Sequence, residues 1–131
     1  MGGEAGGSRR STEQRRAIRE AVRNAGRPMR PEEVLEAAQR DVPTLGIATV
    51  YRNLKAMLDA GFLRAVELPG DSTRRYELAA LDHHHHFHCG RCDRVYDIDI
   101  CPGDLSRHAP AGFSVESHEL LLHGICSDCA G

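Results

Sequence analysis

The feature that most restricts the fold of this chain is the placement of its cysteines. Four of them form two C-x-x-C pairs, Cys89-Gly-Arg-Cys92 and Cys126-Ser-Asp-Cys129, and 33 residues separate the pairs. Two such pairs supply the four thiolates of a tetrahedral zinc site, which would fasten two distant segments together. We therefore predict a structural zinc ion on these cysteines. The alternatives are two redox-active C-x-x-C motifs or buried thiols, and Cys101 is left over as a small buried residue or an additional ligand.

The chain is divided chemically into two parts. All five cysteines and all eight histidines lie after residue 80. Residues 1–79 hold 14 Lys/Arg and 11 Asp/Glu, a net charge of +3, whereas residues 80–131 hold 3 and 8, a net charge of −5; together they give the −2 of the whole chain. A mildly basic part followed by an acidic, ligand-rich part predicts two domains with different partners.

The sequence also indicates a compartment. No apolar run approaches the roughly 20 residues that a membrane span needs, and the first eight residues lack the apolar segment of a signal peptide. We expect residues 1–10 to form a disordered tail. We also expect the protein to act in the cytoplasm without a membrane partner, where C-x-x-C pairs bind metal more often than they form disulfides.

The basic part has the pattern of three helices followed by a β-hairpin. Ser11 and Gln14 resemble the two ends of a capping box, Pro31 suits the first turn of a second helix, and Gly61 suits the end of a third. A Pro-Gly-Asp turn separates two strand-like runs. This order predicts a winged helix-turn-helix over residues 11–79, with a hinge at about 79–82. The expected elements are helices over about 11–25, from Pro31 and over 47–60, and strands over 62–68 and 74–78.

The third predicted helix carries polar side chains that cannot all face a core. In a helix-turn-helix this helix enters the major groove, where Tyr51 offers its ring to thymine methyl groups and Arg52 can bind guanine or phosphate. Arginines elsewhere would meet the flanking phosphates; the alternative is that they form a solvated helix face. The candidate DNA-contacting residues are Thr49, Tyr51, Arg52 and Lys55 on the third helix, Arg15, Arg16 and Arg19 on the first, Arg74 and Arg75 on the wing, and Arg9 and Arg10 in the tail.

The run Asp82-His-His-His-His-Phe-His88 is the most unusual stretch of the chain. Successive side chains of a strand point to opposite faces, so His84 and His86 would serve one metal site while His83 and His85 serve another. Carboxylates or further histidines must complete each shell; a solvated His run is the alternative. The available partners are Glu77, Asp97, Asp99, Asp104, His108, His118 and His123.

The remainder of the acidic part predicts short elements. A strand is expected over 94–100, a short helix over 104–109, and one or two strands within 113–125. Together with the helical first part, this makes the expected fold class α+β, with a metal-binding domain over residues 83–131.

Three motifs together resemble the ferric uptake regulator family of bacterial metal-sensing repressors. They are Gly46-Ile-Ala-Thr-Val-Tyr-Arg52, the His tract joined to its C-x-x-C pair, and Gly124-Ile-Cys126-x-x-Cys129. The resemblance covers about residues 11–129. It implies a homodimer with an N-terminal winged helix and a C-terminal α/β dimerisation domain, a structural zinc on the four paired cysteines, and a regulatory metal between the domains.

The resemblance also implies two further sets of ligands. The regulatory ligands that it implies are Glu77, His84, His86 and Asp97. The accessory ligands that it implies are His83, His85, His118 and a carboxylate from the following helix. Counting from Asp97 gives Asp104 for that carboxylate, whereas counting back from His118 gives Cys101. Pro28 stands where many members supply another histidine.

The implied function is metal-dependent repression. One ion held by both domains would set the separation of two recognition helices in the dimer, roughly 34 Å for successive half-sites. Metal would then favour binding to an AT-rich palindromic operator and silence metal-uptake genes. A His/carboxylate shell suits Fe²⁺ or Mn²⁺, although Zn²⁺ binds such ligands readily.

Other functions remain as alternatives. A zinc-uptake or peroxide-sensing regulator of the same family fits the same motifs. A zinc hydrolase would need an H-E-x-x-H motif or an evident general base, and neither is present, so we do not expect an enzyme. A metal-storage protein would leave the helix-turn-helix unexplained.

Overall fold

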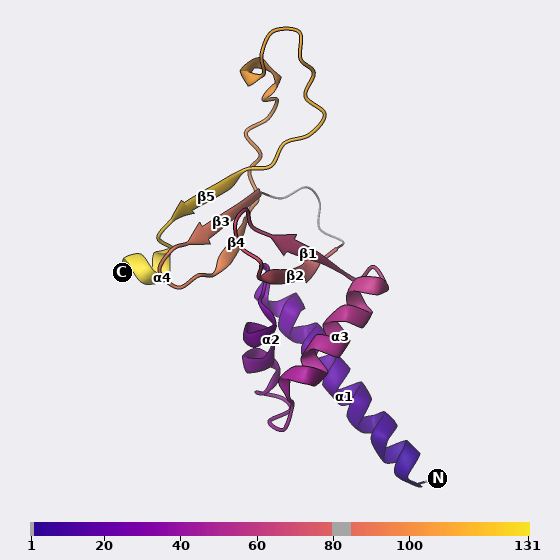
Figure 1. Cartoon of the computed structure of the whole chain (residues 1–131). Helices are drawn as coiled ribbons and strands as arrows, with labels where there is room; N and C mark the ends of the chain where they lie inside the picture. Colours follow the sequence, from indigo (N-terminus) through magenta and orange to yellow (C-terminus); the bar gives the residue numbers. More distant parts are fainter. Residues whose placement is uncertain (1, 80–84) are drawn as a thin grey trace. The chain divides into compact units, whose positions relative to one another are not determined.

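The computed structural model describes residues 2–79 and 85–131, and for residues 2–8 only the backbone (Figure 1). The chain divides into two compact units, residues 1–81 and 82–131, called here the N-terminal and C-terminal units. The mixture of helices and small antiparallel and mixed sheets makes the fold α+β. Within the described residues, no helix combines the length and apolarity needed to cross a membrane.

The N-terminal unit consists of three helices and a hairpin in the predicted order. Its elements are α1 (Gly2–Ala25), α2 (Pro31–Ala38), α3 (Ile47–Asp59), β1 (Leu63–Glu67) and β2 (Arg74–Leu78). The strands β1 and β2 pair antiparallel, and Met29 adds a bridge to Tyr76 through two backbone hydrogen bonds of 2.9 and 2.8 Å. The bridge fixes the hairpin to the segment that joins α1 to α2.

One element begins earlier than the sequence predicts. The first helix starts at Gly2, so Ser11 lies inside it rather than at its N-terminus, and residues 2–10 are not the expected tail. The physical reason is that extending a helix fixes one residue for each hydrogen bond gained, which costs far less than starting a new helix. The capping-box pattern was therefore an incorrect guide to the start of this helix.

The end of α3 follows from one glycine. Gly61 has φ +81°, a conformation that side chains with a Cβ rarely adopt. Its N–H donates to the Leu58 carbonyl and the N–H of Phe62 donates to the Met57 carbonyl, which is the Schellman pattern. The turn that results directs the chain from the helix into β1.

Apolar side chains at helical spacing form the core of the N-terminal unit. They lie between the three helices and the hairpin, and Ile18, Val34, Val50 and Leu54 are fully buried. Burial of such side chains is the main source of stability in a domain of this kind. The buried cluster comprises Ala17, Ile18, Ala21, Val22, Met29, Val34, Ala38, Leu45, Val50, Leu54, Met57, Leu63 and Tyr76.

The C-terminal unit is built around a three-stranded sheet. Its elements are β3 (His85–Cys89), β4 (Val95–Ile98), the 3-10 helix η1 (Ser106–His108), β5 (Leu121–Gly124) and α4 (Ser127–Ala130). The central strand β3 pairs antiparallel with β4 and parallel with β5. Figure 1 shows the long excursion of the chain between β4 and β5. Within it, residues 113–120 do not form a strand, because Phe113 and Val115 are exposed and pair with no neighbouring strand.

Candidate metal centres and nucleic-acid interface

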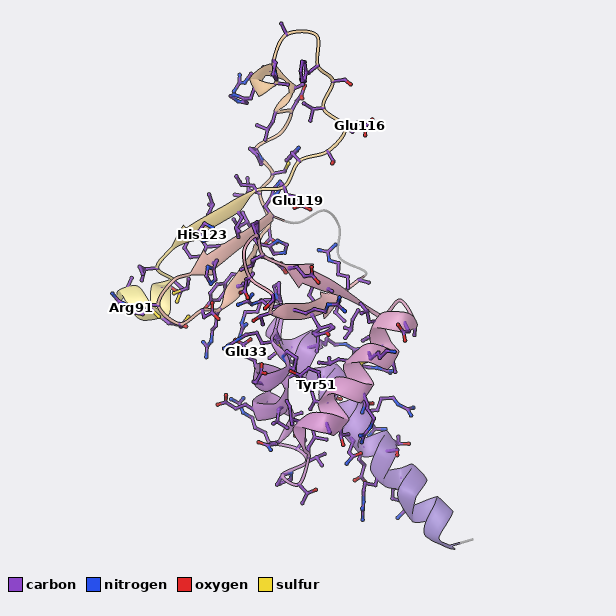
Figure 2. All side chains as sticks on the ribbon, viewed as in Figure 1. Glu33, Tyr51, Arg91, Glu116, Glu119 and His123 are labelled. Atoms are coloured by element: carbon purple, nitrogen blue, oxygen red, sulfur yellow. The ribbon has the colours of Figure 1, made fainter. Side chains whose placement is uncertain are left out.

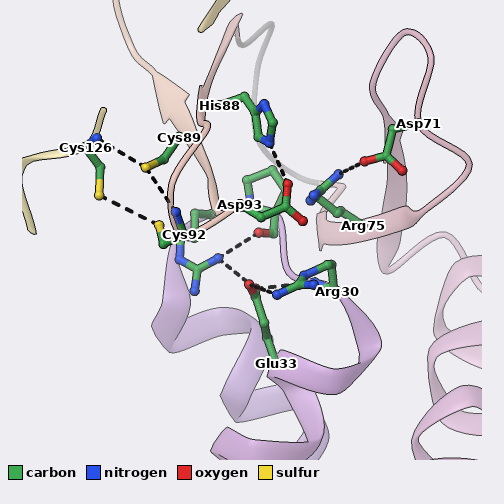
Figure 3. A network of polar contacts seen from close by, with 11 residues as sticks. Arg30, Glu33, Asp71, Arg75, His88, Cys89, Cys92, Asp93 and Cys126 are labelled. Carbon is green, nitrogen blue, oxygen red and sulfur yellow. Dashed lines mark hydrogen bonds and ion pairs between the residues drawn. The ribbon is translucent and has the colours of Figure 1, made fainter. Parts of the chain in front are cut away.

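The four paired cysteines converge on one point of the C-terminal unit. Their Sγ atoms all lie within 4.8 Å of one another, and Cys92 and Cys126 are separated by 3.8 Å between sulfurs (Figure 3). Four sulfurs at about 2.3 Å from a tetrahedral zinc ion lie about 3.8 Å apart. The parallel pairing of β3 with β5 brings the two C-x-x-C pairs together, because Cys89 lies opposite Gly124, two residues before Cys126.

Backbone N–H groups prepare this cluster for negative charge. The N–H groups of Cys92 and Cys126 both donate to Cys89 Sγ at 3.4 Å and lower the pKa of the Cys89 thiol to about 5. The N–H of Cys129 likewise lowers the pKa of Cys126. By contrast, the hydrogen bond with Cys126 and burial raise the pKa of Cys129 to about 12. The pKa values of Cys126 and Cys129 are thus moved in opposite directions, and a divalent cation beside both sulfurs would favour the thiolate form of each.

A glycine allows the sheet to close beside the cluster. A Cβ built on Gly124 would lie 3.0 Å from the Phe87 ring, a contact tighter than nine in ten that real Cβ atoms make. A larger residue here would require the Phe87 ring to give way by a few tenths of an ångström. The absence of a side chain at Gly124 therefore lets β3 and β5 pair beside the cluster without moving the Phe87 ring.

The face of β3 that carries His86 meets a carboxylate. His86 and Asp97 are cross-strand partners on β3 and β4, and His86 Nε2 lies 3.3 Å from Asp97 Oδ1. Both side chains are largely buried. Glu77, the third predicted regulatory ligand, lies on β2, where Arg64 contacts its Oε1 at 2.7 Å. His83 and His84 fall outside the described residues.

The opposite face of β3 forms a different cluster. His85 Nε2 lies 3.5 Å from Cys101 Sγ, which lies 3.4 Å from His118 Nε2, and the two rings stack with centroids 5.0 Å apart. Asp104, the predicted accessory carboxylate, is not in this cluster. It instead accepts the Ser106 N–H at 2.8 Å at the start of η1, which lowers its pKa. Among the described residues, Cys101 rather than Asp104 therefore lies in one cluster with His85 and His118.

The second nitrogen of His85 determines what its ring can do. Its Nδ1 accepts the Leu120 N–H at 2.9 Å. The proton of the neutral ring is therefore on Nε2, the atom that faces Cys101. In this arrangement His85 donates a hydrogen bond to the sulfur, whereas a metal ligand must present a lone pair.

A third group pairs His123, one of the available partners in the sequence, with His88 and Asp93, and this grouping was not predicted. His88 and His123 are opposite one another in the β3–β5 register, with Nδ1 atoms 3.4 Å apart. His88 Nε2 lies 2.6 Å from Asp93 Oδ1 (Figure 3). The alternation of β3 could have placed His88 on the His86 face, but the sequence holds no signal for the register that brings His123 beside it.

The outer face of α3 carries the predicted DNA-reading residues. Tyr51, Arg52 and Lys55 are exposed while Val50 and Leu54 face the core (Figure 2 labels Tyr51). Arg52 donates to Thr49 Oγ1 at 3.1 Å, which orients its guanidinium along the helix. The Tyr51 hydroxyl donates to Glu32 at 3.4 Å; partial burial, followed by the charge of this carboxylate, raises the pKa of Tyr51.

Among the arginines predicted to contact DNA, those on α1 are exposed, whereas those on the wing are engaged in ion pairs. Arg15 and Arg16 are exposed on α1, and the Arg19 guanidinium lies 5.0 Å from the centroid of the Phe62 ring. Arg74 pairs with Glu67 on the hairpin. The prediction for Arg75 was wrong, because its side chain is 1% exposed and pairs with Asp71 at 3.2 Å.

The folds of the N-terminal and C-terminal units, together with the four-cysteine cluster, define a class of protein in which a winged-helix domain is joined to a domain of metal ligands. The model of the ferric uptake regulator family matches residues 7–123, and the chain belongs to this family. It is 30% identical over 126 residues to the peroxide operon regulator of Bacillus subtilis, covering 92% of this chain and 84% of that protein. It is 33% identical over 124 residues to the transcriptional regulator FurA of Mycobacterium tuberculosis, covering 92% and 83%.

Solved structures show the same likeness. The ferric uptake regulator Fur of Helicobacter pylori, described as having three functional metal-binding sites, matches with a TM-score of 0.66 at 25% identity over 90% of this chain and 80% of that one. A zinc-bound manganese uptake regulator matches with a TM-score of 0.74 at 26% identity, over 86% and 87%.

Proposed function

We propose that this protein is a metal-responsive repressor that binds operator DNA as a homodimer and controls metal-uptake or metal-homeostasis genes. The single observation that carries the proposal is the coexistence of an exposed polar face on α3 with an imidazole–carboxylate pair and a four-cysteine cluster. Family membership supports the same function. A metalloenzyme or a storage protein would leave the α3 face without a role.

The four-cysteine cluster is proposed to hold structural zinc. The 3.8 Å sulfur separation fits the ion, and the N–H groups that donate to Cys89 stabilise thiolate charge. Zinc would fix β3, β5 and α4 in their observed arrangement. It would serve stability rather than sensing, because all four protein ligands leave no open position.

The regulatory ion is proposed to bind Glu77, His84, His86 and Asp97. His86 and Asp97 are already adjacent across β3 and β4, whereas Glu77 ends the wing of the other unit. An ion shared by these ligands would couple the two units, and DNA and metal would then favour each other's binding by the same factor. The His/carboxylate set favours Fe²⁺ or Mn²⁺ as the ion sensed, over a thiolate-preferring metal.

The accessory site is proposed to use Cys101 in place of Asp104, with His85, His118 and the predicted His83. The S···N distances of 3.4–3.5 Å suit a tetrahedral ion. Loading would require the His85 ring to give up the Leu120 hydrogen bond. We therefore expect this site to fill after the regulatory site.

The homodimer is supported by apolar exposure on the C-terminal unit. A group of large apolar side chains exposed to water is typical of a protein–protein interface. The exposed set consists of Ile100, Phe113, Val115, Leu122 and Ile125, with exposed fractions from 41 to 79%. A second copy would cover them and place two α3 helices on one operator.

The test is metal-dependent operator binding by His86→Ala. The variant should keep its structural zinc and its dimer but lose the response to added Mn²⁺ or Fe²⁺ on an AT-rich palindrome, measured by fluorescence anisotropy. His108→Ala is the matched control, because His108 is an exposed imidazole in η1. A His86→Ala protein that responds to metal like the wild type contradicts the assignment.

A peroxide-responsive regulator is the second candidate, favoured by the likeness to the Bacillus subtilis peroxide operon regulator and by Asp97 beside His86. Ferrous iron reduces peroxide, whereas Mn²⁺ at the same ligands does so far less readily. Peroxide should therefore release the Fe²⁺-loaded protein from its operator and leave the Mn²⁺-loaded protein bound. Equal behaviour of the two forms would contradict this version.

A further inference from the structure

We infer that His88 and His123 form an additional metal site on the surface of the C-terminal unit, with Asp93 as the residue that orients it. This site lies outside the three ligand sets proposed above. Its ligand would be a borderline divalent transition metal such as Zn²⁺, because imidazole nitrogen suits such ions.

The position of the two rings follows from the sheet. His88 on β3 and His123 on β5 are register partners in a parallel pair, so their side chains leave the same face of the sheet. The rings meet edge to face, with centroids 5.5 Å apart. His123 is exposed, and Figure 2 shows it on β5. Water can therefore fill the remaining coordination positions.

The separation of the two Nδ1 atoms fits a bound ion better than a hydrogen bond. They lie 3.4 Å apart, well beyond the usual 2.9–3.0 Å of a good hydrogen bond that ends on nitrogen or oxygen. Two nitrogens at about 2.05 Å from one ion, separated by this distance, subtend an angle of about 110° at the ion, which is close to tetrahedral.

Asp93 sets the tautomer that a ligand needs. His88 Nε2 donates to Asp93 Oδ1 at 2.6 Å, which leaves a lone pair on Nδ1 directed at His123. A metal-ligating histidine almost always donates its other N–H to a carboxylate, carbonyl or water. Asp93 has φ +63°, and it is held in this left-handed conformation directly after Cys92 in the knuckle. The carboxylate is thus a positioning group and not a ligand.

The first experiment counts ions. Wild type, His123→Asn and the control His108→Asn are dialysed as full-length protein against the same micromolar free Zn²⁺, and bound zinc is measured per protomer. The inference predicts one ion fewer in His123→Asn and no loss in His108→Asn. Equal zinc in wild type and His123→Asn overturns it, and so does an equal loss in His108→Asn, which would mean unspecific binding to exposed imidazoles.

The second experiment tests the orienting role. Asn also tolerates the left-handed conformation, so Asp93→Asn removes the charge with little backbone strain. The variant should reach the wild-type number of ions at saturation, but with a 10- to 100-fold weaker affinity for the last one. An unchanged affinity overturns the role of Asp93.

A third measurement needs no variant. In wild-type protein, long-range ¹H–¹⁵N spectra report the ring nitrogens directly. Added Zn²⁺ should shift Nδ1 of His88 and of His123 at the same ion equivalent. Shifts at neither ring, or at only one of them, overturn the shared site even if both variants misfold.

Discussion

The N-terminal and C-terminal units differ in how many apolar side chains they bury. Thirteen apolar side chains form the buried cluster of the N-terminal unit. Among the described residues of the C-terminal unit, the buried hydrophobic side chains are Cys89, Val95 and Cys126. Two of these three are proposed zinc ligands. Apolar burial therefore accounts for the folding of the first unit, and we expect the proposed zinc ligation to take the place of a core in the second.

The largest expected effect is on the C-terminal unit. Cys129→Ser removes one of the four proposed zinc ligands, and a structural zinc contributes roughly 10 kcal/mol or more to the folding of a small site. We expect zinc content and the dimer to be lost together, measured by metal analysis and size-exclusion chromatography. Hydrogen exchange should show residues 85–131 unprotected while α1–α3 keep their protection.

Cys101→Ser is the matched control, since Cys101 is outside the four-cysteine cluster. It should retain zinc in that cluster and remain dimeric. A Cys129→Ser protein with full zinc content and an intact dimer would show that the C-terminal unit does not depend on the ion.

The second largest effect should be on the N-terminal unit and leave the zinc of the C-terminal unit in place. Leu54 is fully buried in the N-terminal core, so Leu54→Ala should cost about 2–5 kcal/mol of unfolding free energy. Thermal unfolding should show the N-terminal unit weakened, while the zinc content of the protein stays unchanged. A loss of zinc in this variant would mean that the two units do not fold by separate means.

The third effect is on DNA and not on stability. Arg52→Ala should weaken operator binding by about 1–3 kcal/mol if Arg52 contacts a base edge. Arg15→Ala should weaken specific and nonspecific binding alike and make the salt dependence shallower, as the loss of a phosphate contact does. Anisotropy titrations at several salt concentrations distinguish the two. Unchanged operator affinity in Arg52→Ala would exclude α3 as the reading helix.

The smallest effect concerns acid. The Thr73 N–H, and to a lesser extent Arg75, lower the pKa of Asp71 in the wing turn. A lowered pKa in the folded state contributes stability that is complete above the ordinary pKa of about 3.9 and disappears as pH falls through the lower folded value. The Thr73 amide resonance should therefore move only below about pH 4. In Asp71→Asn that movement should be absent.

The C-terminal unit should fail at higher pH than this turn. Zinc binding requires deprotonated thiols, so acid releases the ion. Zinc release recorded in the same titration should therefore precede the change at Thr73. The opposite order would contradict the distinction between the two units.

The sequence predicted those features that depend on local spacing. Helical periodicity and the glycine after α3 place the three helices, and the C-x-x-C spacing identifies the four sulfurs that meet. Alternation along the His tract separates His85 from His86. In each case the information lies within a few residues, because helix, turn and knuckle geometry is local.

The features that were wrong or missed depend on distant segments. Counting forward from Asp97 and counting back from His118 gave different accessory ligands, Asp104 and Cys101. The count could not decide between them, because the chain follows an irregular path between β4 and β5. Arg75 is buried and pairs with Asp71, which the local pattern of the wing did not indicate. The His88–His123 pair follows from the parallel register of β3 with β5, and register is set by packing across the sheet, not by the sequence of either strand.

The alternation of side chains along β3 means that the face each histidine occupies depends on its distance in residues from Cys89. Even positions present His86 and His88 to one face, and odd positions present His85 and Cys89 to the other. Deleting one histidine while Cys89 stays anchored would turn every imidazole before the gap to the opposite face. A substitution in the tract would therefore alter one ligand at a time. An insertion or deletion would keep the remaining histidines on their faces only if it added or removed two residues.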